Sequence, residues 1–130
     1  APVTIALFTD TDLQKRARKI ARVGGVKNFT DEQLQYFMQN LPAEFARYDA
    51  QQTSDYLALN AGLVAMNLVL ALTDQGIGTN IILGFDKSKI NEVLDIEERF
   101  RPEVLITVGY AAEKVEPSYR LPVDEIIDKR

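Results

Sequence analysis

The stretch YLALNAGLVAMNLVLALTDQGIGTNIILGFD, residues 56–86, decides the fold of this chain. Residues 56–73 are apolar with no polar face, and a helix that is hydrophobic all round must be covered by protein or lipid. Gly76 stands where a left-handed cap is wanted, so we expect the helix to end just before it. NIIL, residues 80–83, reads as a short strand that ends at Gly84. The stretch therefore predicts a buried central helix that leads into a strand.

The same apolar run just reaches the length of a membrane span. Asn60, Gly62 and Asn67 interrupt it, and no basic flank is present to orient a span. We therefore favour a core helix, with Asn60 and Asn67 capping neighbouring loops or strands, and we expect no membrane partner.

The composition predicts one domain, residues 1–130, able to bury about two thirds of its unfolded surface. Cysteine and histidine are both absent, which excludes disulfides, thiolate nucleophiles, imidazole bases and the common zinc sites. The net charge of −4 argues against general affinity for nucleic acid, and we expect no nucleic-acid partner. A reducing compartment is compatible with this composition, and we expect a cytoplasmic protein.

Two elements precede the central helix and differ in character. PVTIALF, residues 2–8, predicts an interior strand. LQKRARKIAR, residues 13–22, predicts a helix with one apolar stripe and a basic remainder, ended by Gly24 and Gly25. The basic face could hold an anionic ligand, a nucleotide phosphate or a membrane surface. We favour a solvated face, because the rest of the chain is acidic.

Aromatic residues mark the next predicted helix, which begins with a capping box at residues 30–33 and carries a stripe to residue 48. Pro42 should kink or split it. The stripe predicts core packing, although Tyr36, Phe37 or Phe45 could instead line a pocket for a flat aromatic ligand. After the central segment the pattern predicts a short surface helix, a strand EVLITVG and a final amphipathic VDEII.

Few polar groups in this sequence could carry out a reaction unaided. We find no pair of carboxylates at a diagnostic spacing, no phosphate-binding loop and no metal-ligand cluster. Without histidine or cysteine, catalysis must rest on carboxylates, arginines, backbone amides or a cofactor that carries the reaction itself. The cofactor route is the leading one.

The order of several short motifs resembles the nitroreductase family. These motifs are the apolar helix ending in GIG, the strand-glycine unit IILGFD, Val93-Leu94, Arg101-Pro102 followed by VGY, and SYRLPVDEII. The resemblance covers about residues 56–130, and no single motif is specific. It implies an α+β fold in which a central, mostly antiparallel sheet is packed by helices around a long buried helix.

One family motif has no match. Family members carry a basic segment near their start that contacts the phosphate of FMN, and nothing here corresponds to it. The chain also opens on Ala1 rather than methionine. We therefore expect this chain to be incomplete at its N-terminus, lacking the first helices of the family.

The resemblance implies an FMN-dependent oxidoreductase that takes hydride from NADH or NADPH and passes electrons to a nitroaromatic, quinone or similar acceptor. Ile82, Leu83 and Gly84 match the segment that passes along the isoalloxazine edge, with Leu83 N–H as the donor toward N5. Without the resemblance, Gly84 would more simply end a strand. Arg120 matches an arginine that binds the FMN phosphate. Ser118 stands where some members carry a basic residue, so the resemblance implies fewer charged contacts to the phosphate on this side.

The resemblance also implies an intertwined homodimer with FMN at the interface, which fits the apolar excess of the central helix. It places residues 12–50 in the variable part that often covers the substrate, so we expect Tyr36 or Phe37 to contact the small-molecule acceptor. The alternative is a flavin-free structural or binding module that keeps the dimer core, with the basic helix at 13–22 as its interaction face. The unmatched phosphate motif favours this alternative, whereas IILGFD and SYRLP favour the enzyme.

Overall fold

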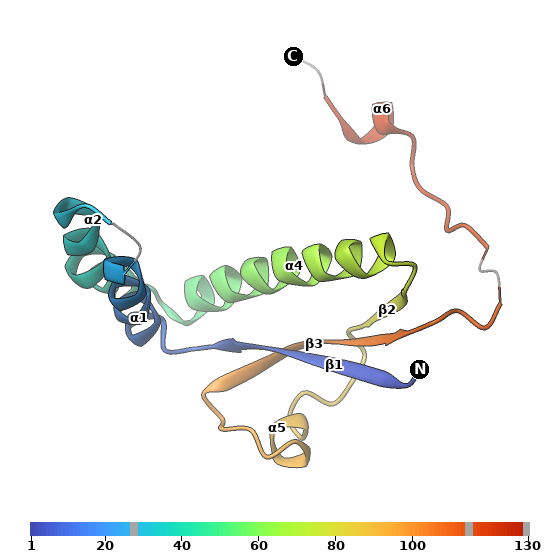
Figure 1. Cartoon of the computed structure of the whole chain (residues 1–130), viewed down its shortest axis with the longest axis horizontal. Helices are drawn as coiled ribbons and strands as arrows, with labels where there is room; N and C mark the ends of the chain where they lie inside the picture. The colour runs from blue at the N-terminus through green and yellow to red at the C-terminus, as the bar shows by residue number, and fades with distance from the viewer. Residues whose placement is uncertain (27–28, 114–115, 129–130) are drawn as a thin grey trace.

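The computed structural model describes residues 1–26, 29–113 and 116–128. A three-stranded antiparallel sheet lies beneath one long helix, and a group of shorter helices lies beyond one end of the sheet (Figure 1). The elements are β1 (Val3–Asp10), α1 (Leu13–Val26), α2 (Asp31–Gln35), η1 (Tyr36–Asn40), α3 (Leu41–Phe45), α4 (Ala50–Asp74), β2 (Gly78–Ile82), α5 (Ile90–Val93), β3 (Phe100–Gly109) and α6 (Val123–Ile126). The expected α+β architecture is confirmed.

The strand order is β1-β3-β2, so the last strand of the sequence lies in the middle. Leu7 pairs with Val104, but the next residue, Phe8, pairs with Pro102, so the register shifts by one residue between them. Proline has no N–H to donate to the neighbouring strand. On its other side, β3 pairs with β2, from Gly78 opposite Gly109 to Ile82 opposite Leu105. The expectation that residues 2–8 form an interior strand is wrong in the described sheet. Here β1 is an edge strand, because β3 inserts between it and β2.

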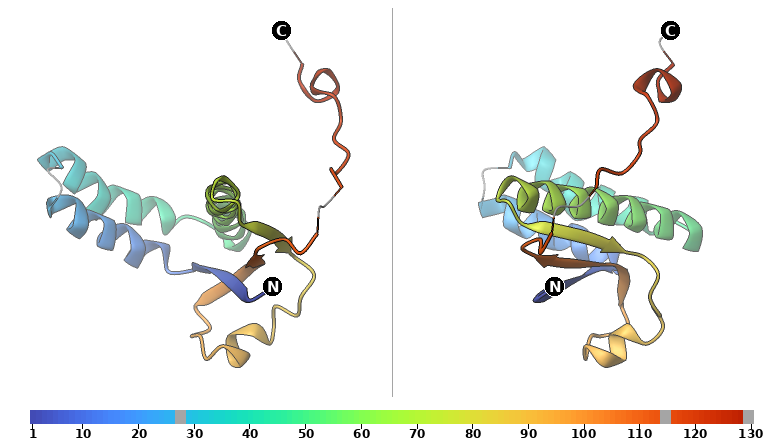
Figure 2. Two further views of the ribbon diagram at one scale, coloured as in Figure 1. Left: turned by 45° about the vertical axis from the view of Figure 1, so that its right-hand side comes forward. Right: turned by 90° about the vertical axis from the view of Figure 1, so that its right-hand side faces the viewer.

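The helix α4 crosses the sheet and contacts all three strands (Figure 2). Its Ala65 packs with Val104 and with the fully buried Ile106 of β3. Asp49 caps its start, where its carboxylate accepts from Gln52 N–H, so α4 begins six residues before the apolar run. The sequence pattern missed this first turn because a solvated helical turn carries no apolar signal.

The C-terminal end of α4 is the predicted one. Gly76 has a φ of +73°, Gly76 N–H donates to the Thr73 carbonyl, and Ile77 N–H donates to the Leu72 carbonyl. These two bonds form a Schellman motif, in which glycine adopts the left-handed conformation without the steric cost of a side chain. The turn aims β2 back beneath α4.

The basic helix and the aromatic segment form a separate group of short helices. The helix α1 continues through the two glycines to Val26, past its expected end. The predicted capping box is confirmed, because Thr30 Oγ1 accepts from Gln33 N–H and Gln33 Oε1 accepts from Thr30 N–H. Pro42 splits the following segment as expected. A π-helical turn, η1, precedes it, and Leu41 N–H donates to the Tyr36 carbonyl five residues back.

Candidate functional site

The backbone just beyond β2 presents hydrogen-bond donors that have no acceptor among the described residues. Ile82 is the last residue of β2 and pairs with Leu105. Within the described part of the chain, neither Leu83 N–H nor Gly84 N–H donates a hydrogen bond. The Leu83 carbonyl does accept one, from Phe85 N–H at 3.1 Å. Two consecutive amides are therefore open to an external acceptor.

A pocket of about 350 Å³ adjoins these amides, between α4 and the sheet. Ile81 and Leu83 contribute to its wall, whereas Ile82 points to the opposite face because strand side chains alternate. Most of the lining is apolar, and Lys87 and Glu103 are its charged members. The full lining is Ala58, Ala61, Gly62, Ala65, Met66, Ile81, Leu83, Lys87, Glu103 and Val104. Such a surface suits a flat aromatic ring better than a charged ligand.

Gly84 occupies open space beside this pocket. A Cβ built there would meet nothing within 4 Å, and its backbone has no positive φ. The protein itself therefore does not require glycine at this position. A requirement for glycine would have to come from a group that approaches the backbone from outside.

A tight turn fixes the loop that follows Gly84. Ser88 donates to Asp86 Oδ1 through its amide at 3.1 Å and its hydroxyl at 2.6 Å. These bonds, together with Lys89 Nζ at 3.3 Å from Oδ2, lower the pKa of the Asp86 carboxyl. Their contribution to the turn is present above the ordinary pKa of an aspartate and is lost as pH falls through the lowered value.

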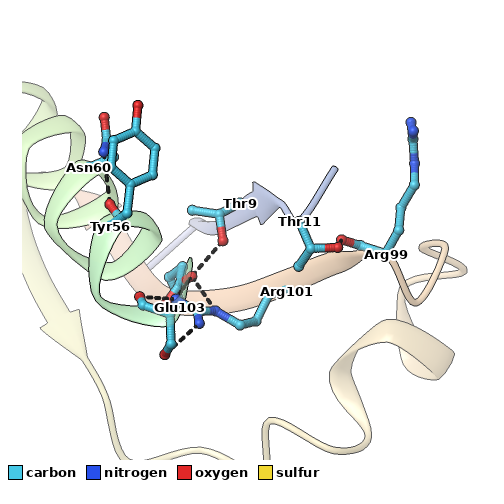
Figure 3. A network of polar contacts seen from close by, with 8 residues as sticks. Thr9, Thr11, Tyr56, Asn60, Arg99, Arg101 and Glu103 are labelled. Atoms are coloured by element: carbon cyan, nitrogen blue, oxygen red, sulfur yellow. Dashed lines mark hydrogen bonds and ion pairs between the residues drawn. The ribbon is translucent and has the colours of Figure 1, made fainter. Parts of the chain in front are cut away.

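A buried polar cluster lies at the floor of the same region (Figure 3). Glu103 is only 8% exposed, and its Oε1 accepts from Thr9 Oγ1 at 2.5 Å and from Arg101 Nε at 2.7 Å. Arg101 also donates to Ser54, through Nη1 to the hydroxyl at 2.8 Å and through Nη2 to the carbonyl at 3.1 Å. The cluster joins β1, β3 and the first turns of α4. It therefore sets how α4 lies over the sheet beside the pocket.

We expect Arg101→Met to destabilise the protein by about 3 kcal/mol, because it leaves the buried Glu103 carboxylate without its counter-charge. Urea unfolding followed by circular dichroism measures the loss. The double variant Arg101→Met/Glu103→Leu removes both charges and should regain most of the stability. A single variant within about 1 kcal/mol of wild type would show that water screens this pair.

The structure does not bring Arg120 to the pocket. Arg120 lies on the tail beyond residue 116, which extends away from the sheet (Figure 1). Its Nη1 donates to the neighbouring Tyr119 carbonyl at 2.9 Å, and it forms no ion pair among the described residues. A ligand contacting both Arg120 and Leu83 would need a different placement of the tail or a second chain.

Tyr36 and Phe37 lie in the group of short helices, and neither lines the pocket beside Leu83. Phe37 stacks on Phe29 with ring centroids 5.3 Å apart, and the Tyr36 ring meets it edge-on at 5.5 Å. Tyr36 is 40% exposed, so the expected core stripe is only partly buried in this chain. Within one chain these three rings contact one another.

Sequence reasoning missed the buried Glu103 and the pocket residues of α4. Glu103 had a detectable signal, since a carboxylate two residues after Arg101 in an apolar strand shares its face and can pair with it. Gly62 and Met66 had none, because an all-apolar helix does not reveal which side meets the sheet.

Comparison with known proteins identifies the family of this chain. The model of the nitroreductase family matches residues 2–110. The chain belongs to the nitroreductase family. It is 63% identical over 130 residues to Spy0809 of Streptococcus pyogenes, which is provisionally named as an NAD(P)H nitroreductase. The chain spans 64% of the length of that relative.

Solved structures support the same family. The crystal structure of a nitroreductase family protein from Streptococcus pneumoniae TIGR4 superposes with a TM-score of 0.95 at 86% identity, covering 100% of this chain and 65% of that one. A nitroreductase from Exiguobacterium sibiricum, provisionally named and solved in complex with FMN, has a TM-score of 0.88 at 27% identity. The match covers 98% of this chain and 61% of that one.

Proposed function

We propose that this chain carries the catalytic core of an FMN-dependent oxidoreductase that passes hydride or electrons from NADH or NADPH to a nitroaromatic, quinone or similar acceptor. The pair of unused amides at Leu83 and Gly84, beside an apolar pocket, is the observation that carries the proposal. The FMN complex of the Exiguobacterium sibiricum nitroreductase supports it. We further propose that the protein works in the cytoplasm.

The described residues fit the ring of FMN better than its phosphate. Bound FMN would supply a ring nitrogen that accepts and returns hydride, so no histidine or thiol is required. The Leu83 and Gly84 amides would donate to the acceptor atoms at the ring edge, where they also stabilise added negative charge. The apolar lining contributed by α4 would exclude water from the ring. Arg120 would bind the phosphate through its guanidinium, once the tail is brought to the site.

We propose that a second copy of the chain covers α4. Only Leu57, Ala61 and Ala65 of this fully described helix are buried within one chain, so most of its apolar surface is not covered by the described residues. Its outward side exposes large apolar residues at alternating spacings of four and three, which form a continuous stripe typical of helix–helix contacts. The members of the stripe are Leu59, Leu63, Met66 and Leu70, of which Met66 also lines the pocket beside Leu83.

By length and composition alone α4 could also cross a membrane, as the core helix of many proteins could. Its packing argues for a protein partner. The helix lies along a sheet whose two outer strands have unpaired edges in the described chain, and hydrocarbon does not accommodate such edges. A homodimer with α4 at its interface would cover the stripe and could bring the partner's tail toward Leu83.

Flavin titration and turnover test the proposed function. The purified chain is titrated with FMN by fluorescence quenching, and NADH or NADPH oxidation is followed with a nitroaromatic and a quinone. We expect weak or no FMN binding by the 130 residues and tight binding by the longer Streptococcus pneumoniae protein, because the phosphate contacts are divided between segments. Each missing charge-assisted hydrogen bond costs about 1.5–3 kcal/mol. Equal, tight binding by both would show that the phosphate site has been misplaced. No flavin in either would remove the enzyme proposal.

We expect Arg120→Ala to weaken FMN binding about ten- to a hundredfold, the loss of one such contact. The melting temperature without flavin should not change, since among the described residues this side chain forms one hydrogen bond, to the adjacent Tyr119 carbonyl. Isothermal titration of the variant at the aligned position of the longer protein measures the affinity, and differential scanning calorimetry of this chain measures the melting temperature. An affinity change below about threefold would leave Arg120 as a surface residue.

A flavin-free binding module is the second candidate. The separation of Arg120 from the Leu83 and Gly84 amides within one chain favours it. The two candidates differ in colour, because protein that retains FMN absorbs visible light.

A further inference from the structure

The outward face of α1 concentrates positive charge. Its inward stripe packs against η1 and α3 and consists of Leu13, Ala17 and Ala21, all buried. Four exposed cations follow one another on the opposite side at spacings i, i+3, i+4 and i+7, which share one helix face. They are Lys15, Arg18, Lys19 and Arg22. The structure thus turns the basic residues into a single surface, which we call the α1 basic face.

None of these four side chains forms an ion pair within the described residues. Basic residues elsewhere do find carboxylates, as Lys89 does with Asp86 and Arg101 with Glu103. Like charges three and four residues apart repel and destabilise a helix. Residues 13–22 hold five basic and no acidic residues, whereas ten basic and nineteen acidic residues lie outside them. Positive charge is therefore concentrated at one end of the molecule and is not distributed evenly over its surface.

One exposed apolar side chain borders the α1 basic face. Val23 is 51% exposed and follows Lys19 by four residues, so the two are neighbours on the surface. Ile20 is 39% exposed but lies on the inward side, where it lines a pocket with Leu13 and Ala17. A nucleic-acid phosphate forms no favourable contact with an apolar side chain, whereas such a side chain is buried favourably at the boundary between lipid headgroups and acyl chains. The helix group lies at one end of the molecule, beyond the sheet (Figure 2), where a broad surface can approach it.

We propose that the α1 basic face docks the protein on an anionic lipid bilayer. The four cations bind lipid headgroups, and Val23 rests in the interfacial layer. The apolar stripe of α1 stays packed in the protein, so the helix lies on the membrane and does not insert. Binding is reversible and falls with salt, because charge attraction near an anionic surface acts within a Debye length. The proposed contact departs from the expectations of a solvated helix face and of no membrane partner, and it does not depend on flavin.

Vesicle sedimentation tests the proposal with two matched variants. The chain is incubated with phosphatidylcholine vesicles that contain none or about 30% of phosphatidylglycerol, at two salt concentrations. In Arg18→Gln/Lys19→Gln/Arg22→Gln three cations leave the α1 basic face. The control, Arg47→Gln/Lys87→Gln/Lys89→Gln, makes the same change in net charge elsewhere. Circular dichroism confirms that both variants fold.

We expect the wild type and the control to bind anionic vesicles at low salt and to release them as salt is raised. The α1 variant should bind about a hundredfold more weakly, as the loss of three cations near such a surface predicts. Equal binding by the two variants, or equal binding to neutral vesicles, would overturn the proposal. Binding to a single-stranded oligonucleotide but not to vesicles would overturn it in favour of nucleic acid.

Discussion

Gly84→Val should abolish FMN binding and, with it, NAD(P)H oxidation, while the folded protein remains intact. A side chain at this position meets open space in the protein, and no positive φ restricts it, so the substitution should not disturb folding. The new methyl groups would occupy the space in which the flavin ring approaches the Leu83 and Gly84 amides. We expect FMN affinity to fall at least a hundredfold, or more than about 2.7 kcal/mol.

Leu83→Ala is the matched control for this effect. It keeps the amide and removes a side chain that is 67% exposed, so stability should change by less than about 1 kcal/mol. FMN should remain bound. Flavin binding is measured on variants at the aligned positions of the longer Streptococcus pneumoniae protein, which we expect to bind FMN tightly, and folding is checked on both variants of this chain. Circular dichroism is recorded before flavin content is measured. A folded, yellow and active Gly84→Val protein would remove this segment from the site.

Leu63→Glu should convert the proposed homodimer into monomers. Leu63 lies in the exposed stripe of α4 and is 64% exposed in one chain, so glutamate costs the monomer little. In a two-fold interface the substitution occurs twice and would bury two unpaired carboxylates. We expect the dimer dissociation constant to rise at least a thousandfold, about 4 kcal/mol. If FMN binds at the interface, flavin affinity should fall with it.

Val93→Glu controls for added charge on an exposed apolar residue. Val93 is 75% exposed on α5, away from the α4 stripe, so this variant should stay dimeric and keep its flavin affinity. Sedimentation velocity over a range of concentrations gives the oligomeric state of all three proteins. A wild-type chain that is monomeric at every concentration would contradict the proposed interface, as would a Leu63→Glu protein that still dimerises.

Local signals in the sequence were enough for most elements of the fold. The glycine cap after α4 and the capping box of α2 were predicted because a left-handed residue and a reciprocal side-chain bond are set by nearby residues. The strand pattern likewise located β2 and β3. Family resemblance, rather than periodicity, indicated the backbone at 82–84 and Arg120. These roles stay predictions.

What depends on distant residues could only be read from the structure. The insertion of β3 between β1 and β2 makes β1 an edge strand, because sheet order depends on pairings about a hundred residues apart along the chain. The side of α4 that meets the sheet was hidden, since an apolar helix carries no polar face to orient it. The unused amides at Leu83 and Gly84 could be recognised only from the structure, because the acceptors that could bind an amide lie on other segments of the chain. Helices, caps and strands follow from contacts within a few residues, whereas the pocket, the buried Glu103 and the exposed stripe of α4 arise from the packing of separate segments.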